Sequence, residues 1–373
     1  MTNKRVVVIG GGIVGAAAAY YFAEAGWTDV LLVEAEHFGA GATGGSFGGI
    51  RQQFAHPLEI EFSRRGLEFW KTAAETFDAP CDFHQDGYLL LTSRPEVAEG
   101  LANAASTQRS LGMTDVEMLD ADGISALVPW LTTDDLVAGC WTPKDGHVLP
   151  MDGLTALVKA ARLRDVEFRE RWPVAAITKT EGLWQVHGPE TVDAEVVVVA
   201  AGAGTRQLLK PYGIDLDIRI VDHLAMLTET AFPGEHVPMM IDLDSGLCVE
   251  REGQGLVLAM LGRNPPPNDY MDLSERFFQA AVQRAPVLTD ISVVKYFKAH
   301  PTIGGDGMPY VGEVEPGLWA IAFVGHGAMH GPPLAETVVA KITGLSDVVD
   351  LTPWDLRRTL GEPTVWWRKE ATG

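Results

Sequence analysis

The first pattern with clear chemical meaning is a glycine fingerprint, Gly10-x-Gly12-x-x-Gly15, which follows a run of β-branched residues and precedes an alanine-rich stretch. The first glycine permits a tight turn after a strand, the second lets the backbone approach a pyrophosphate, and the third lets the next helix pack on the strand. Glu34 follows about twenty residues later, where a carboxylate accepts hydrogen bonds from ribose hydroxyls. Because that carboxylate would repel a 2′-phosphate, the pattern predicts a dinucleotide site that disfavours NADP; a glycine turn without a ligand is the alternative.

Cations are absent from this part of the chain. No Lys or Arg occurs between residues 6 and 50, and Arg51 is the first to follow. The charge of a bound phosphate must therefore be met by backbone N–H groups and by the N-terminus of the helix.

Glycine also recurs in three later segments, residues 39–49, 196–204 and 325–331. One fingerprint does not distinguish NAD from FAD. A nicotinamide dehydrogenase usually places its remaining chain in a separate catalytic domain, whereas three distant glycine-rich segments favour a fold that wraps one long cofactor. We therefore favour FAD.

Hydrophobic periodicity predicts the elements that must position these loops. Residues 5–9 and 30–33 are expected to be strands on either side of a helix over 14–25, which makes a βαβ unit. The fully apolar pattern of a buried parallel sheet returns at 196–200 and 318–324. We expect two interleaved domains: one formed by residues 1–80, 149–205 and 299–373, and one formed by 81–148 and 206–298.

Further elements follow from local signals. Pro57 is expected to begin a long helix, and Pro332 with Pro333 to open the last one. Asp242 and Asp244 suggest a polar turn, and Trp366 with Trp367 suggests packing near the C-terminus. Other predicted elements are strands at 166–168, 174–178, 218–228, 247–251 and 256–261, helices at 96–112, 151–164 and 273–284, and a turn at 265–267.

Composition excludes several functional classes. The chain has 29 Lys and Arg against 50 Asp and Glu, a formal net charge of −21, which disfavours nucleic acid and anionic membrane surfaces as partners. No apolar run approaches the ~20 residues of a membrane span, and no secretory signal is evident, so we expect a cytoplasmic protein. Cys81, Cys140 and Cys248 lie far apart, which indicates buried reduced thiols rather than a disulfide or metal site.

The ordered set of motifs resembles the D-amino-acid oxidase family of FAD-dependent oxidoreductases, in particular its sarcosine oxidase and dimethylglycine dehydrogenase branch. The resemblance covers nearly the whole chain and implies an α/β fold: a Rossmann-like FAD-binding domain with an interleaved α+β substrate domain on a mainly antiparallel sheet. The segments that carry it are VVVIGGGIVGAAAAYYFAEAG at 6–26, GATGGSFGGIRQQF at 41–54, DGHVLPMDGLTALVKAA at 145–161, VVVVAAGAG at 196–204, DGMPYVGEV at 306–314 and VGHGAMHGPPLAET at 324–337.

The resemblance extends the set of expected FAD contacts and implies that the flavin is not covalently bound. Relatives that tether it use a Cys near the position of Ala299 or a His in the first glycine loop, and neither is present. Met151 likewise replaces a histidine that anchors a second flavin in heteromeric relatives. The expected FAD-binding residues are Gly10, Gly12, Ile13, Val14, Gly15, Glu34, Ala35, Ala42, Thr43, Gly48, Gly49, Val174, Ala201, Gly202, Gly327, Ala328, Met329 and His330.

The resemblance also implies residues that bind the substrate. Arg51 matches the family's carboxylate-binding arginine, whose planar fork suits a carboxylate; an exposed arginine near a helix is the alternative. His330 lies one residue past the place where related sarcosine oxidases carry a Lys. Either His330 replaces that cation, or Arg51 acts alone, or the substrate has no carboxylate. His300 lies near an Arg-Pro position of relatives, and His326 belongs to the Gly-His-Gly loop, where it orders the backbone; for His300, as for His223, a structural role is the alternative.

The implied activity is oxidation of a small secondary amine or amino acid: hydride passes from the N-bearing carbon to the flavin, and water hydrolyses the imine. No metal or catalytic triad is needed. A dehydrogenase is favoured, because Val257 aligns with the Lys that promotes oxygen reaction in family oxidases, although Lys295, Lys298 or His330 could fill that space. An electron-accepting partner or heteromeric subunit would follow. The alternatives are a flavin-binding assembly factor or non-catalytic subunit, since GGIRQQF is typical of one such relative, and an NAD-dependent dehydrogenase.

Overall fold

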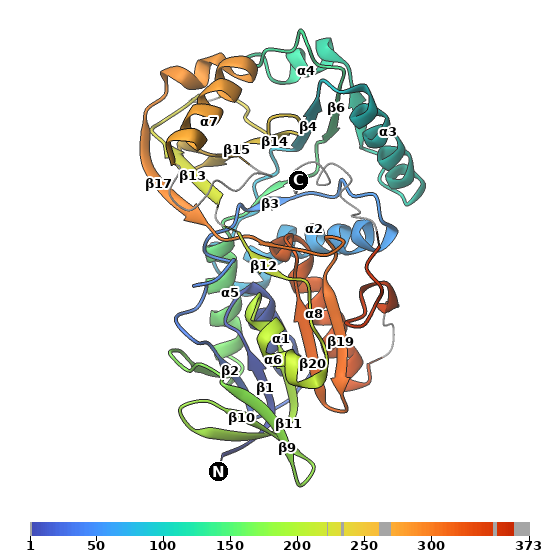
Figure 1. The fold of residues 1–373 in the computed structure, drawn as a ribbon, viewed down its shortest axis with the longest axis vertical. Coiled ribbons are helices and arrows are strands. Elements are labelled where there is room, and N and C mark those ends of the chain that lie inside the picture. Colours follow the sequence, from blue (N-terminus) through green and yellow to red (C-terminus); the bar gives the residue numbers. More distant parts are fainter. Residues whose placement is uncertain (1, 222, 233–234, 261–269, 346–348, 362–373) are drawn as a thin grey trace.

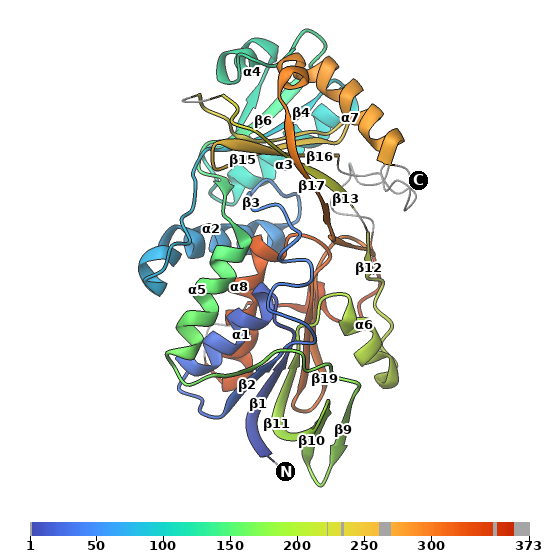
Figure 2. The same ribbon diagram turned by 90° about the vertical axis from the view of Figure 1, so that its left-hand side faces the viewer.

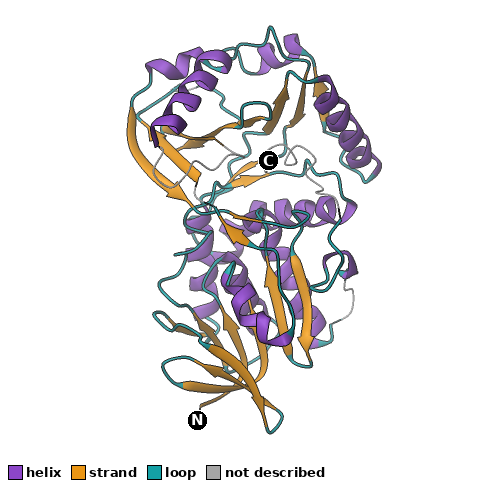
Figure 3. Cartoon of the chain, viewed as in Figure 1, coloured by secondary structure: helices purple, strands orange, loops and turns teal. Residues whose placement is uncertain are grey.

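Two eight-stranded sheets organise the chain, as seen in a computed structural model that describes residues 2–221, 223–232, 235–260, 270–345 and 349–361. The sheet that contains the N-terminal strand lies at one end of the molecule and the second sheet at the other, with helix α2 (Pro57–Phe77) between them (Figure 1). Figure 3 shows the same division by type of secondary structure.

The first sheet has the order β19-β20-β11-β1-β2-β8, and the β9–β10 hairpin extends it from β11. From β20 to β8 all neighbours are parallel, while β19 is antiparallel to β20. The central strands carry the apolar runs 6–9, 30–33 and 196–199, because both faces of the sheet are covered there. The strands are β1 Thr2–Ile9, β2 Val30–Val33, β8 Glu167–Arg169, β9 Ala176–Thr180, β10 Leu183–His187, β11 Thr191–Val199, β19 Tyr310–Glu315 and β20 Leu318–Ala322.

Different elements cover the two faces of this sheet (Figure 2). Helices α1, α2, α5 and α8 pack on the face to which Val6 and Val8 point. Helix α6 and the β9–β10 hairpin cover the face of Val7 and Ile9. The predicted α/β architecture is thereby confirmed. The helices are α1 Ile13–Glu24, α5 Pro150–Arg162, α6 Gly204–Leu209 and α8 Gly327–Thr343.

The second sheet has the order β17-β13-β16-β15-β14-β4-β6-β5 and is antiparallel except between β14 and β4. Helices α4 and α7 contribute to the core on one face, and α3 contributes to the core on the other. The elements are β4 Tyr88–Thr92, α3 Pro95–Ser110, β5 Glu117–Leu119, α4 Ala121–Leu127, β6 Ala138–Thr142, β13 His223–Thr228, β14 Met239–Asp242, β15 Leu247–Glu252, β16 Gly255–Met260, α7 Tyr270–Arg284 and β17 Val293–Ala299.

Two short strand pairs form where the chain passes between the sheets. β3 (Gly49–Ile50) pairs with β7 (Gly146–His147), and β12 (Arg219–Ile220) pairs with β18 (Thr302–Ile303). Each large sheet is built from separated segments of the chain, as interleaved domains require. The exact domain boundaries stay a prediction.

The expectation that Pro332 and Pro333 open the last helix is wrong, because α8 begins at Gly327 and contains both prolines. Pro332 has no N–H to donate to the carbonyl of Ala328. The indole Nε1 of Trp70 donates to that carbonyl instead, at 2.9 Å. A tertiary contact thus satisfies the carbonyl that proline leaves without its helical partner.

Two other local predictions need correction. Val174 lies in the loop before β9, which begins only at Ala176. Asp242 is not simply a turn residue, because it ends β14 and is buried. The predicted turn at 265–267 and the Trp366–Trp367 pair lie outside the described residues.

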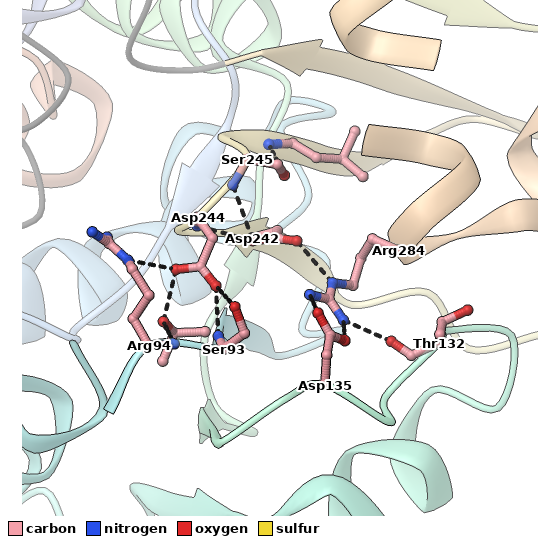
Figure 4. Close-up of polar contacts among 10 residues, drawn as sticks. Ser93, Arg94, Thr132, Asp135, Asp242, Asp244, Ser245 and Arg284 are labelled. Atoms are coloured by element: carbon pink, nitrogen blue, oxygen red, sulfur yellow. Dashed lines mark hydrogen bonds and ion pairs between the residues drawn. The ribbon is translucent and has the colours of Figure 1, made fainter. Parts of the chain in front are cut away.

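Several charged side chains of the second sheet form ion pairs (Figure 4). Arg284 donates from Nε to Asp242 at 2.8 Å and from Nη1 to Asp135 at 2.7 Å. Asp244 accepts from the Arg94 guanidinium and from the Ser93 backbone and hydroxyl. The Arg284 contacts join α7 to β14 and to the segment that follows α4, and the Asp244 contacts join the turn after β14 to the segment that follows β4.

The described residues contain neither a membrane span nor a metal-binding cluster. No helix there is long and apolar enough to span a bilayer. The same residues hold no cluster of His, Cys, Asp and Glu suited to a metal. All three cysteines are buried and free, as predicted.

We expect Arg284→Met to lower the thermal unfolding midpoint. Arg284 and Asp242 are only 2% and 3% exposed, and removal of one partner from a buried pair costs about 3–5 kcal/mol, since the other charge stays buried without compensation. Differential scanning calorimetry checks the shift. The double substitution Arg284→Met with Asp242→Asn should recover part of it, whereas Arg206→Met, in an exposed pair with Asp215, should leave the midpoint nearly unchanged. An unchanged midpoint for Arg284→Met would contradict this account.

Candidate active site

The glycine fingerprint forms the predicted turn. Gly10 has a φ of +115°, and a Cβ there would lie 2.3 Å from the carbonyl oxygen of Ala200. A Cβ on Gly15 would lie 1.9 Å from the carbonyl oxygen of Gly10. A side chain at either position would therefore displace backbone.

The N-terminus of α1 fits a phosphate group. Gly12 at the N-cap has no side chain, and the first turn contains no acidic residue, so the exposed N–H groups and the positive end of the helix dipole face no fixed negative charge within that turn. Thr43 Oγ1 accepts a hydrogen bond from Ile13 N at 3.1 Å, which brings the second glycine loop against the turn.

Glu34 lies directly after β2, beside this turn. Its Oε2 accepts from Gly11 N at 2.6 Å and its Oε1 from Glu36 N at 2.9 Å. Each carboxylate oxygen can accept further hydrogen bonds. The Glu34 carboxylate therefore fits the ribose-binding role that the sequence predicts, and the donor set of this turn fits the dinucleotide part of FAD.

Residues 39–49 run along the junction between the two sheets. The carbonyl of Gly48 accepts from Val148 N at 2.9 Å, and a Cβ on Gly48 would lie 1.6 Å from the carbonyl oxygen of Val148. A Cβ on Gly49 would lie 2.4 Å from Sδ of Met239, on the second sheet. The loop is therefore enclosed by residues from both halves of the fold.

The other predicted cofactor residues lie near the carboxyl ends of the parallel strands, where ligands of such sheets bind. Gly202, after β11, has a φ of +56°, and no heavy atom lies within 4 Å of a Cβ placed there. Helix α8 begins at Gly327, and its N-cap residue His326 also has a positive φ, +56°. Ala35 follows Glu34, Ala42 precedes Thr43, Val14 lies in the first turn of α1, Val174 precedes β9, Ala201 follows β11, and Ala328, Met329 and His330 lie in the first turn of α8.

Arg51 is buried, with 3% exposure, so the alternative of an exposed arginine is wrong. Its Nη1 donates to the carbonyl of Gln53 at 2.6 Å, and its Nη2 lies 3.1 Å from Nε2 of His326. Its guanidinium carbon lies 4.2 Å from the ring centroid of Phe54. Because a guanidinium only donates, His326 must accept through Nε2, and a neutral His326 ring then carries its proton on Nδ1. A buried cation in this position can receive an anionic group.

His330 joins the same cluster but is not a cation. Its ring lies 4.9 Å from that of Phe54 and 5.9 Å from that of His326. Burial, followed by the charge of Arg51, lowers the pKa of His330 to about 3. His330 therefore cannot replace the Lys of related sarcosine oxidases at neutral pH. Its Nε2 atom is buried and has no hydrogen-bond partner among the described residues.

Asp145 fixes the segment that follows Arg51. It accepts from Gln52 N at 2.9 Å and from Gln52 Nε2 at 2.8 Å. Burial raises the pKa of Asp145 to about 7, although the Gln52 hydrogen bonds and the Arg51 charge oppose this increase. Because Asp145 lies just before β7, it links the Arg51 segment to the strand that pairs with β3.

Four candidates lie on or beside the second sheet. Lys295 and Lys298 are exposed on its edge strand β17. Val257 is 7% exposed on β16 and lies in the same apolar cluster as Tyr88 and Met239. His223 is the first residue of β13.

Three further positions lie close to the second glycine loop. The backbone N of His300 would be 3.1 Å from a Cβ on Gly45, and Ala299 precedes it in β17. Sδ of Met151 would be 2.6 Å from a Cβ on Gly39. Neither Ala299 nor Met151 offers a nucleophile for a covalent flavin link.

The sequence did not single out Phe54, Tyr88, Asp145 or Glu250. Phe54 and Asp145 lie within segments quoted for the resemblance, so a signal existed for them. Tyr88 and Glu250 are strand residues of the second sheet, brought to the glycine loop only by the tertiary fold. No local pattern distinguishes them.

Comparison with known proteins bears on the family. The family model described as FAD dependent oxidoreductase matches residues 5–341. Mitochondrial dimethylglycine dehydrogenase of Rattus norvegicus is 27% identical over 357 residues, which cover 87% of this chain and 41% of that protein. Glycine oxidase of Pseudomonas putida is 27% identical over 295 residues, 75% of this chain and 76% of that protein. The chain spans 40–41% of the length of the dimethylglycine dehydrogenases it matches.

A solved structure supports the fold. L-proline dehydrogenase from P. horikoshii is similar with a TM-score of 0.87 and 24% identity, over 96% of this chain and 98% of that one. Since the family model covers most of the chain and its fold is that of solved flavoenzymes, this chain belongs to the D-amino-acid-oxidase-type family of FAD-dependent oxidoreductases, with FAD as its cofactor.

Proposed function

We propose that this chain oxidises the C–N bond of a small secondary amine or amino acid. The observation that carries the proposal is the buried guanidinium of Arg51, held beside Phe54 and His326 at the end of the glycine loop. Names of similar proteins support the substrate class, since they refer to dimethylglycine, sarcosine, 4-methylaminobutanoate and glycine. All four of those compounds carry both an amine and a carboxylate.

The predicted contacts at the α1 turn, the 39–49 loop, the loop after β11 and the start of α8 would hold FAD, without a covalent bond. Bound FAD supplies the hydride acceptor for oxidation of the carbon next to nitrogen, and the imine product is hydrolysed by water. The chain itself supplies orientation and charge.

Arg51 would hold the substrate carboxylate through charge-assisted hydrogen bonds, which gain strength where water is excluded. Asp145 fixes the adjacent Gln52 backbone, and His326 fixes one arm of the guanidinium. His330, neutral at physiological pH, would contribute a ring nitrogen rather than a charge. His300, directly after β17, would be a further substrate-binding residue.

We further propose that the enzyme is a dehydrogenase that passes electrons to a partner protein or subunit. Val257 offers no cation to the anion that forms when oxygen takes up an electron, so the electrostatic stabilisation of that step is missing. Lys295 and Lys298, the alternative sources of a cation, are exposed on the edge strand β17, whereas Val257 is buried.

The first test uses the purified protein. Acid precipitation should release a yellow supernatant, identified as FAD by mass spectrometry, and leave a colourless pellet. Anaerobic titration with secondary amines, N-methyl amino acids, D-amino acids and L-proline should then bleach the flavin absorbance with at least one compound. Bound flavin that no amine reduces would favour an assembly factor or non-catalytic subunit, and a bound nicotinamide cofactor without flavin would overturn the whole proposal.

Arg51→Met should weaken a carboxylate-bearing substrate or competitor more than it weakens FAD. A lost charge-assisted contact is worth roughly 1.5–3 kcal/mol, or about ten- to over a hundredfold in affinity. Perturbation of the flavin spectrum measures the affinity of the competitor, and fluorescence of released FAD measures retention of the cofactor. Arg64→Met, on the outer side of α2, is the control and should match wild type. Equal carboxylate affinity in Arg51→Met and wild type would refute the clamp.

Val257→Lys should accelerate reoxidation of the reduced enzyme by oxygen, because the new ammonium group stabilises the developing anion. Stopped-flow absorbance compares reoxidation in air with reoxidation by an acceptor dye. Since Glu250 lies directly across the ladder from Val257, the substitution is repeated with Glu250→Gln, so that an ion pair cannot neutralise the new charge. Val294→Lys, at a position 61% exposed on β17, is the control. Fast reoxidation of wild type by air alone would contradict the assignment as a dehydrogenase.

A further inference from the structure

Glu250 is a buried acid on the face of the second sheet that meets the glycine loop. It lies on β15 opposite Val257 of β16. Cys248, two residues earlier on the same strand, lies with Val257 in the apolar cluster on that face, against which Phe47 of the glycine loop packs. Glu250 itself is 2% exposed, so its carboxyl group is enclosed at the junction of the two sheets.

The contacts of this carboxyl group converge on one peptide. Its two oxygens lie 3.2 and 3.1 Å from the backbone N of Gly48. The carbonyl of Gly48 accepts from Val148 N on its other side, at 2.9 Å. Gly48 is thus held by β15 through its N–H and by the segment after β7 through its C=O. Arg51 follows three residues later, so the position of its backbone depends on how Gly48 is held.

The charge state of Glu250 follows from its surroundings. Burial raises the pKa of Glu250 to about 8; the hydrogen bond from Gly48 opposes this increase, and the charge of Glu252 adds to it. No cation among the described residues pairs with Glu250. The titratable groups that interact with it are Cys248 and Glu252 on its own strand and Tyr88 on β4. Tyr88 in turn interacts with Arg51, whose guanidinium carbon lies 5.9 Å from the Tyr88 ring centroid, and with Asp145. At neutral pH the carboxyl group of Glu250 therefore holds a proton.

Ionisation would work against this contact. One backbone N–H stabilises the carboxylate by less than burial destabilises it, because the pKa is raised despite the hydrogen bond. A buried carboxylate without a cation favours movement toward water, which takes it away from Gly48. The folded state binds this proton more tightly than the unfolded chain does, so the stability that Glu250 contributes falls as the pH rises toward 8.

We propose that protonated Glu250 is a positioning residue, which holds the Gly48–Gly49 backbone in place for the flavin and for Arg51 and releases it when the carboxyl group ionises in alkaline solution. This role rests on the proposed function, because it gives the loop a cofactor and a substrate to receive. Glu250 would act through the Gly48 peptide and not by contact with substrate.

Hydrogen exchange of the holoenzyme tests the contact directly. Mass spectrometry of a peptide that covers residues 44–50, corrected for the intrinsic pH dependence of exchange, reports protection of the Gly48 amide. In wild type, protection should fall about tenfold or more between pH 7 and pH 9.5, where most Glu250 would be ionised. Glu250→Gln keeps an acceptor oxygen but cannot ionise, so its protection should stay constant. Glu250→Met removes the acceptor and should lose protection at both pH values.

FAD release supplies the functional readout. Fluorescence of free FAD should rise above pH 8 in wild type, stay flat in Glu250→Gln and be high throughout in Glu250→Met. Glu252→Gln, on the same strand and half-buried, is the control. Because the Glu252 charge adds to the raised pKa of Glu250, FAD release in this variant should still depend on pH but should begin at a lower pH than in wild type.

The outcomes separate this inference from the proposed function. Protection that falls equally with pH in wild type and Glu250→Gln would overturn the role of ionisation, and the Gln variant tests this even if Glu250→Met fails to fold. Normal protection in a folded Glu250→Met would overturn the positioning role, even if amines bleached the flavin. If the protein bound no flavin, the proposed function would fail, while exchange at Gly48 would still decide whether Glu250 holds the loop.

Discussion

The site depends on close backbone approach at glycine. A Cβ on Gly48 would lie 1.6 Å from the carbonyl of Val148, and one on Gly66 would lie 1.8 Å from the carbonyl of Met329. The first contact sets the glycine loop against the segment that follows β7, and the second sets α2 against the start of α8. Since neither contact leaves room for a side chain, any larger residue would move a loop that carries the cofactor or Arg51.

The second determinant is how charge is distributed around Arg51. His330 is held neutral by burial and by Arg51, and burial also keeps the proton on Glu250 at neutral pH. Burial raises the pKa of Asp145 to about 7, and its oxygens are directed to Gln52. His330 and Asp145, which both interact electrostatically with the Arg51 guanidinium, thus have pKa values shifted toward their neutral forms. An anionic ligand meets a buried cation with little competition, which suits a carboxylate.

Features encoded by neighbouring residues could be predicted from the sequence. The βαβ unit, the Gly10–Gly15 turn and the start of α2 at Pro57 depend on local periodicity and turn chemistry, and the structure contains them. The start of α8 could not be predicted, because the carbonyl that Pro332 leaves free is satisfied by Trp70 of another helix. The ion pair of Asp242 could not be predicted for the same reason, because its partner, Arg284, lies on α7.

The same reasoning explains why the contacts that hold the glycine loop and the Arg51 segment could not be predicted. The glycine loop and the Arg51 segment are held by Asp145, Val148 and Glu250, which lie far from them in sequence and reach them only because the chain crosses four times between the sheets. Each of these contacts joins the segment that holds Arg51 either to β15 of the second sheet or to the residues on either side of β7. A shift of the second sheet would therefore move Arg51, the proposed substrate clamp, relative to the α1 turn. Interleaving makes the distance between cofactor and substrate a property of the whole fold rather than of either sheet.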